Sequence, residues 1–529
     1  MKTVFLRVLE AEDKATALLA TIRDSEAARR KQRFDVDPTS FASVPRSPFA
    51  YWVSERLRRL FKELPPFEAE GRVAKQGLAT ADDFRFVRVL WEVPPALIGE
   101  QWFPFAKGGN FSPFYADVYL AVNWERSGEE IKNNLNERGG IRSNVWMLRD
   151  TAGNCFFRPA VTWPLRTQGG LSLRAMPAGC IFGHKGPAAF VETDDSDELL
   201  ALLAVTNGDA FKAMVDMQMA FGSYEVGVLQ RTPLPRFTEA SRREVAKLAR
   251  RAWSLKRSLD TRTETSHAFT LPALLQVAGA DLAARAATWS EHVRTVEADL
   301  LAIQAELDER CFVLYDIDEA DRRAITEGFG SINLSAGTAE TDADADAESE
   351  SEADDEGEPE SSADNRSLAA ELVSWAVGVA FGRFDVRFAT GARALPPEPE
   401  PFDPLPVCSP AMLTGDDAMP LARPPTGYPL AFPETGVLVD DPGHARDLSA
   451  AVRAVFDVVF GAGADRWWTD VAALLDPKGN DLRVWLAGSF FEHHLKRHSK
   501  SRRKAPIVWQ LGTPLGPLQR LALRPPPHK

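Results

Sequence analysis

The sequence predicts an α+β protein with several domains, and three observations support this fold class. Residues 70–236 are rich in Gly, Pro, Trp and Asn and contain short alternating apolar runs, which predicts strands joined by turns. Residues 238–330 and parts of 367–529 carry apolar residues at helical spacing instead. Residues 336–366 are acidic and lack aromatic residues, which separates two folded regions. A chain of 529 residues has room for three or four domains of roughly 100–200 residues each.

The first 69 residues are predicted to be helical. Residues 1–33 are interpreted as one helix with a charged side and an apolar side. A second short helix over residues 51–64 is expected to end at the two prolines that follow it.

Residues 70–236 are predicted to form a compact unit that is mainly β or α+β. The alternation of apolar and polar residues predicts strands over residues 84–89 and 115–122. Large aromatic residues at this density favour a packed core over exposed positions. We therefore expect the tryptophans of this unit to be buried: Trp91, Trp102, Trp124, Trp146 and Trp163.

Residues 237–335 are predicted to be a helical spacer. Residues 241–259 and 282–307 have the periodicity of two long helices, which would pair as a hairpin or extend as a rod. Asp281 stands directly before the second helix and is expected to be its N-cap, because a carboxylate accepts hydrogen bonds from the first free amides of a helix.

Residues 336–366 are predicted to be a disordered acidic linker. Residues 340–364 contain 13 acidic residues and no base, and so polar a segment buries too little surface to offset its conformational entropy. The formal net charge of −13 therefore comes from this segment alone. The rest of the chain is neutral and has room for local basic surfaces.

Residues 367–529 are predicted to be a mixed, mainly helical C-terminal domain. An apolar helix is expected over residues 368–381, followed by a proline-rich stretch over 396–433. Further helices are expected near residues 446–460 and 480–498.

Several classes of protein are excluded by the sequence. The four cysteines are widely spaced and form no CxxC pair, which argues against a disulfide framework and a cysteine-rich zinc site. Charged residues interrupt the N-terminus where a signal peptide needs an apolar stretch, and no apolar run approaches the ~18 residues of a membrane span. A cytoplasmic protein without membrane contact is expected.

Catalytic motifs are missing from the sequence. It contains no GxGxxG loop after a strand, no phosphate-binding GxxxxGK[ST], no HExxH and no GxSxG. His494 and His498 are one helical turn apart, a spacing that can hold a metal, but no third ligand is evident and the neighbours are basic. The preferred interpretation is a basic, solvated helix face that contacts phosphate or a partner, and no metal site is predicted.

Two basic segments are the strongest functional signal in the composition. Residues 236–262 hold nine bases and three acids, and residues 483–504 hold seven bases and one acid. Such segments release counterions when they meet nucleic acid. An ordinary solvated helix surface explains the charge equally well.

A resemblance decides between these interpretations. Residues 76–86 (QGLATADDFRF) resemble the signature that follows the catalytic domain in large adenine-specific DNA methyltransferases, which include fused restriction–modification enzymes and BREX-type phage-defence methyltransferases. Further strings follow in the order of that family at residues 102–109, 161–163, 381–385 and 501–511. The signature residues are Gly77, Leu78, Thr80, Asp82 and Phe86.

The chain departs from this family in its catalytic motifs. The glycine loop for S-adenosylmethionine and the [ND]PP[YF] tetrapeptide that holds the flipped adenine are absent, since residues 93–96 and 403–406 match only in part. The resemblance therefore implies a target-recognition domain (70–236), a spacer and a truncated C-terminal domain, with residues 1–69 joining a missing catalytic half. We expect no cofactor in this chain, no catalysis by it alone, and S-adenosylmethionine in a separately encoded catalytic partner.

The implied partners are double-stranded DNA, the catalytic half and other proteins of a defence system. The candidates for reading base edges are Lys107, Arg142, Asn144, Gln168 and Lys185. The candidates for holding phosphates are Arg250, Arg251, Arg257, Arg502, Arg503 and Lys504. Two alternatives remain open: an inactive remnant of a truncated methyltransferase gene, and an intact enzyme with unfamiliar motifs.

Overall fold

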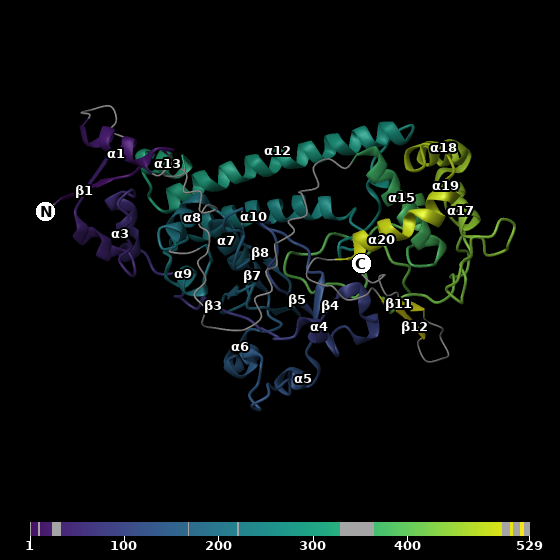
Figure 1. The fold of residues 1–529 in the computed structure, drawn as a ribbon, viewed down its shortest axis with the longest axis horizontal. Helices are drawn as coiled ribbons and strands as arrows, with labels where there is room; N and C mark the ends of the chain where they lie inside the picture. Colours follow the sequence, from purple (N-terminus) through teal and green to yellow (C-terminus); the bar gives the residue numbers. More distant parts are fainter. Residues whose placement is uncertain are drawn as a thin grey trace.

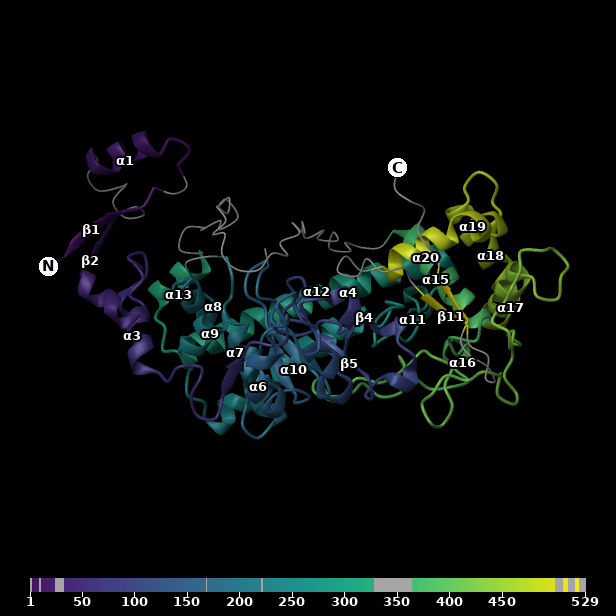
Figure 2. The ribbon, with the colours of Figure 1, turned by 60° about the horizontal axis from the view of Figure 1, so that its bottom comes forward.

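The computed structural model combines helices with several small sheets, which confirms the α+β prediction. It describes residues 2–8, 11–23, 33–167, 169–219, 222–327 and 364–499, and the strand backbones of 508–511 and 519–522. The N-terminal elements lie at one end of an elongated molecule and the C-terminal helices at the other (Figures 1 and 2). Most of the predicted acidic linker, residues 336–363, lies outside the described residues.

The N-terminal segment is not the single helix expected over residues 1–33. Strand β1 (Thr3–Leu6) pairs antiparallel with β2 (Arg33–Val36), and the helix α1 (Lys14–Arg23) lies between them in the chain. The aromatic side chain of Phe5 explains the strand, because its ring stacks on Tyr51 with 4.8 Å between ring centroids. The second predicted helix is confirmed as α3 (Glu55–Glu63).

Two four-stranded sheets form the centre of the molecule. The first sheet is antiparallel throughout and has the order β3 (Val73–Lys75), β10 (Ala188–Phe190), β7 (Ala160–Thr162), β8 (Arg174–Met176). The second sheet has the order β4 (Val87–Val89), β6 (Leu120–Asn123), β5 (Trp102–Ala106), β9 (Ile181–Phe182). Only the β5–β9 pair of this second sheet is parallel.

The two strands expected in this region are shorter than predicted. Residues 83–86 form the helical turn α4 (Asp83–Phe86), because the Asp82 carboxylate caps it by accepting a hydrogen bond from the Arg85 amide at 3.0 Å. The second expected strand begins only at Leu120. Trp124 and Trp163 are buried as expected, whereas the Trp146 side chain is 63% exposed.

Three helices form layers over the first sheet, the shortest packing on β7 and β8 and the two longer ones packing on it. They are α7 (Ser196–Thr206), α10 (Glu239–Asp260) and α12 (Leu282–Leu314). The Asp281 carboxylate accepts from the Ala284 amide at 2.9 Å, which confirms it as the N-cap of α12. Figure 1 shows α12 running along one long side of the molecule.

The helix α12 contributes to two hydrophobic cores. Ile303 and Leu307 pack in the core that also contains the first sheet. Leu282 and Trp289, at the other end of the helix, pack in the core of the C-terminal helices. The predicted spacer is therefore helical, but its longest helix packs into the core of the first sheet and into the core of the C-terminal helices.

Shorter helices complete both ends. Those around the sheets are α5 (Glu129–Lys132), α6 (Arg149–Asn154), α8 (Asp209–Asp216), α9 (Val226–Arg231) and α13 (Glu319–Thr326). The C-terminal elements are α11 (Ala273–Gln276), α15 (Asn365–Ala380), α16 (Arg387–Thr390), α17 (Leu448–Phe460), α18 (Ala464–Leu475), α19 (Leu482–Gly488), α20 (Phe490–His498), β11 (Val508–Leu511) and β12 (Gln519–Ala522). In the described part of the chain, every helix is too short or too polar to cross a lipid bilayer.

A proline-rich segment of the C-terminal region returns to the central sheets. We call residues 395–406 the strap. The carbonyl of Phe402 accepts a hydrogen bond from the Ala178 amide at 3.0 Å, and the Phe402 ring belongs to the core of the first sheet. The strap also borders a cavity of about 390 Å³ whose walls include Trp253 and His267.

Candidate nucleic-acid interface

The signature at residues 76–86 runs beside the end of β9 and fixes the chain there. The Leu78 amide donates to the Phe182 carbonyl at 2.9 Å, and the Leu78 carbonyl accepts from the His184 amide at 3.1 Å. Gly77 lies so close to this strand that a Cβ atom would be 2.1 Å from the carbonyl oxygen of Phe182. Only glycine fits at this position without a backbone shift.

The other signature residues also build the fold. The Thr80 hydroxyl donates to the Asp83 carboxylate at 2.5 Å, Asp82 caps α4, and the Phe86 side chain is fully buried. Asp83 in turn forms an ion pair with Lys107 at the end of β5. The signature therefore sets the position of Lys107 and of the loop that follows it.

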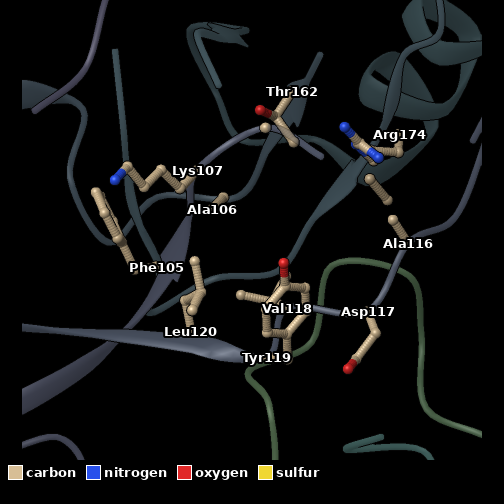
Figure 3. Close-up of a pocket in the computed structure, with 12 residues that line it drawn as sticks. Phe105, Ala106, Lys107, Ala116, Asp117, Val118, Tyr119, Leu120, Thr162 and Arg174 are labelled. Atoms are coloured by element: carbon tan, nitrogen blue, oxygen red, sulfur yellow. The ribbon is translucent and has the colours of Figure 1, made fainter. Parts of the chain in front are cut away.

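Lys107 lies beneath the surface rather than on it. Its side chain is 9% exposed and lines a cavity of about 30 Å³ together with Thr162 and Arg174 (Figure 3). A space of this size holds a water molecule but not a base. Lys107 is thus placed to support the neighbouring loop, and reading of a base edge by this side chain would require it to leave the Asp83 carboxylate.

Two further cations donate hydrogen bonds to the loop that follows β5. The Arg174 guanidinium donates to the Asn110 carbonyl at 3.1 Å, and the Lys256 ammonium donates to the Ser112 hydroxyl at 2.8 Å. Burial, with the charge of Arg174 nearby, lowers the pKa of Lys256 to about 8. These contacts give the loop a fixed shape before any ligand arrives.

Three loops meet at this edge of the sheets, and we call their described residues, 107–112, 165–167, 169–170 and 183–186, the loop cluster. The Leu165 amide donates to the Lys185 carbonyl at 2.9 Å. Gly108 has a φ of +78° and lies so close to the 183–186 loop that a Cβ would be 2.4 Å from the same Lys185 carbonyl. The cluster is therefore tied together through backbone contacts that only glycine allows at Gly108.

The exposed side chains of the loop cluster are cationic, amide-bearing and aromatic. Lys185, Arg166 and Asn110 are exposed, and Phe111 is 42% exposed. Arg166 donates to the Ser223 hydroxyl at 2.6 Å, and among the described residues neither Arg166 nor Lys185 forms an ion pair with a carboxylate. The sequence candidates missed Arg166, Asn110 and Phe111, although the Gly-Gly pairs at 108–109 and 169–170 mark the loops that carry them.

The candidates from the neighbouring turn have separate roles. The Asn144 side chain bonds to the signature backbone: its oxygen accepts from the Ala79 amide at 2.8 Å and its nitrogen donates to the Gly77 carbonyl at 3.0 Å. This amide is therefore a structural clamp with little capacity left for a base. Arg142 is exposed nearby, and the turn η5 (Asn144–Met147) presents Trp146 to solvent.

The phosphate candidates on α10 are paired with acidic residues from distant segments. Arg250 bonds to Glu400 at 2.7 Å, and Arg251 bonds to Asp299 at 3.1 Å. Arg257 is only 7% exposed and lies beside Glu398 of the strap. The basic face expected on α10 is thus largely neutralised where these three arginines lie.

The remaining candidates lie outside the described residues. They are Gln168, Arg502, Arg503 and Lys504. The neighbours of Gln168, Thr167 and Gly169, belong to the loop cluster.

The solvated helix face expected around His494 and His498 is wrong for both histidines. Their side chains are buried, with 4% and 2% of their surfaces exposed. Burial lowers the pKa of His494 to about 4 and that of His498 to about 3, so both rings are neutral at neutral pH. Glu264, from the turn after α10, lies beside them.

Comparison with known proteins gives two relatives, and no protein-family model matches the chain. The chain is 28% identical over 304 residues to the adenine-specific methyltransferase PglX of Lacticaseibacillus casei (strain Zhang). This alignment covers 55% of this chain and 24% of the relative. It is 25% identical over 248 residues to the adenine-specific methyltransferase BrxX of Escherichia coli O9:H4 (strain HS). This second alignment covers 45% of this chain and 19% of the relative. The alignments thus span about a quarter and a fifth of these relatives, and they relate the chain to adenine-specific methyltransferases of the PglX and BrxX type.

Proposed function

We propose that this chain is the DNA sequence-recognition portion of an adenine-specific (N6) DNA methyltransferase in a BREX-type phage-defence or restriction–modification system. In this proposal a separately encoded half binds S-adenosylmethionine and transfers the methyl group. The similarity to PglX and BrxX supports the link to adenine methylation. The single observation that carries the recognition role is the loop cluster, because it presents cations and an amide on a rigid base.

The chemistry of the loop cluster suits the grooves of double-stranded DNA. Arginine and lysine donate to the acceptor edge of guanine, and asparagine pairs with the edge of adenine. Arg166, Lys185 and Asn110 supply these groups on neighbouring loops. Their supports, Arg174 and Lys256, hold the loop that carries Asn110, which reduces the entropy lost on binding.

The exposed aromatic residues next to these polar groups have a second use. Phe111 lies in the loop cluster, and Trp146 lies in the turn η5, which Asn144 ties to the signature. An aromatic ring stacks on an unpaired base with about 1–3 kcal/mol per base. Adenine methylation requires the target base to leave the helix, so rings beside the recognition loops are suited to the distorted DNA that remains.

The test is a selection from random double-stranded DNA, performed with the purified chain and with the chain plus a candidate catalytic half. We expect one sequence to be enriched in both selections and methylated on adenine only when the catalytic half is present. Methyl transfer from labelled S-adenosylmethionine by the chain alone would contradict the proposal that a separate half carries the catalytic site. Absence of sequence-specific binding by both samples would favour an inactive remnant instead.

A further inference from the structure

A buried cluster outside the proposed interface has the donor set of a metal site. The carboxylate of Glu264 and the imidazoles of His494 and His498 offer ligand atoms that all lie within 4.8 Å of one another. The three residues are 5%, 4% and 2% exposed. They come from two segments that are far apart in the sequence, the turn after α10 and the helix α20.

The spacing of the two histidines explains why they face the same point. Residues four apart lie on one face of a helix, so His494 and His498 project together from α20. Their rings stack with 3.8 Å between centroids. Two histidines on one helical face joined by a carboxylate from another segment form a donor set that suits Zn²⁺.

The orientation of the ligand atoms is set by surrounding hydrogen bonds. The Nδ1 atom of His498 lies 3.1 Å from the His494 carbonyl and donates to it, which leaves Nε2 as the ligand atom. This Nε2 lies 3.9 Å from the Glu264 carboxylate. Two zinc–ligand bonds of about 2.0–2.2 Å span up to about 4 Å, so one ion can join these two atoms.

The Glu264 carboxylate has a fixed second partner. The Ser374 hydroxyl, on α15, donates to its Oε2 atom at 2.6 Å, and the distance of 3.9 Å to His498 belongs to the other oxygen, Oε1. Aromatic rings complete the surroundings, since Trp91 packs against His498 and Phe490 against His494. A hydrogen bond from outside the cluster thus orients the carboxylate, as is usual for ligands of a metal ion. Three protein ligands leave the fourth position of a tetrahedral Zn²⁺ to a water molecule.

Neighbouring arginines oppose the binding of a cation and limit its affinity. Arg383 lies 3.5 Å from the Oε1 atom of Glu264. Arg262 and Arg497 both pair with Glu371, at 2.9 Å and 3.3 Å. Three arginines therefore face two carboxylates, which favours an ion held by strong nitrogen ligands over Mg²⁺ or Ca²⁺, whose ligands are mainly oxygens.

We propose that Glu264, His494 and His498 form a structural site for a transition-metal dication of the Zn²⁺ type. The ion fastens α20 to the turn after α10 and, through Ser374, to α15. The burial of all three ligands keeps substrates away from the ion, so its role is structural. This proposal does not depend on the proposed DNA function.

The experiment uses the untagged full chain, stripped with a chelator and titrated with Zn²⁺ or with Co²⁺ as a spectroscopic probe. We expect about one zinc per chain, visible Co²⁺ absorption with nitrogen ligation, and a higher melting temperature with Zn²⁺ but not with Mg²⁺. The wild-type titration requires no substitution, so it tests the site even if a variant fails to fold. Absence of stoichiometric binding by the folded wild type would overturn the proposal.

Variants then assign the ligands. Glu264→Gln and His498→Gln should abolish the Co²⁺ spectrum, and Ser374→Ala should weaken binding by roughly 10-fold because it only orients the carboxylate. The matched control is His493→Gln on the same helix, since His493 packs against Trp485 rather than joining the cluster. Equal Co²⁺ spectra in wild type, Glu264→Gln and His498→Gln would show that the metal binds elsewhere and would overturn the assignment.

Discussion

The loop cluster and the basic face of α10 are both cationic, but different groups surround their charges. On α10, Arg250 and Arg251 bond to carboxylates from residues 400 and 299, and Arg257 is buried beside the strap. In the loop cluster, Arg166 bonds to a hydroxyl and Lys185 is exposed without an ion pair among the described residues. The charge of a sequence segment therefore does not decide whether that charge is available to DNA. The acids that neutralise α10 come from distant segments.

The largest change in stability is expected for Gly77, which holds the signature against β9. Gly77→Ala places a Cβ against the Phe182 carbonyl and forces the signature away from β9. We expect a loss of about 3 kcal/mol in the free energy of unfolding, measured by urea denaturation. The control is Gly153→Ala in α6, where the new methyl meets no atom within 4 Å. A Gly77→Ala protein as stable as the control would show that the signature does not support the cluster.

The second prediction separates the two cationic surfaces directly. The double variant Arg166→Gln/Lys185→Gln should weaken DNA binding, because it removes groups available for base contacts. The difference in binding free energy between the selected sequence and random DNA should fall by about 1–3 kcal/mol. Arg250→Gln should change DNA binding little, because the Arg250 guanidinium is already paired with the Glu400 carboxylate. Fluorescence anisotropy with cognate and random duplexes measures both effects. The opposite ranking would make α10 the DNA-binding surface.

A smaller effect is expected when the acids of the strap are neutralised. Glu398→Gln/Glu400→Gln removes the partners of Arg250 and Ser254 and exposes uncompensated positive charge on α10. We expect non-specific DNA affinity to rise by about 1 kcal/mol and the salt dependence to steepen by about one phosphate contact. Discrimination between sequences should stay unchanged, since phosphate contacts carry no sequence information. Unchanged affinity would show that the face of α10 lies away from DNA.

The last effect depends on pH and concerns Lys256, a cation of α10 that bonds to the loop cluster. Because burial lowers its pKa to about 8 in the folded chain, the unfolded chain binds more protons between about pH 8 and pH 10. The free energy of unfolding should therefore rise with pH across this window, by about 1.4 kcal/mol per pH unit at most from this group. Lys256→Gln should lack this rise. Urea denaturation of both proteins from pH 7 to pH 10 measures the difference, and parallel curves would contradict the assignment.

The sequence predicted the features that local patterns determine. The helices α10, α12 and α15 and the cap at Asp281 follow from apolar spacing and from a carboxylate before the first turn. The strand β1 and the turn α4 were missed, because pairing with β2 and capping by Asp82 outweigh the patterns read for residues 1–33 and 84–89. In each case a contact with another residue decides between helix and strand.

The candidate site was predicted only in part, for a similar reason. Lys185 and Arg142 are exposed near the expected turns, whereas Lys107 and Asn144 are used within the fold. Nothing in the spacing of the sequence indicates that Asp83 lies against Lys107. The third member of the buried histidine cluster, Glu264, was missed because it is distant in sequence from α20.

The strap has a consequence for how the chain is made. Phe402 fills a place in the core of the first sheet, and its carbonyl bonds to Ala178, about 220 residues earlier. At about 5–20 residues per second, a ribosome needs roughly 10–45 s to add that much chain. During this interval the apolar slot for Phe402 is open, and the sheets around it have already left the ribosome. The strap therefore docks late in biosynthesis, and until then this slot can make wrong contacts.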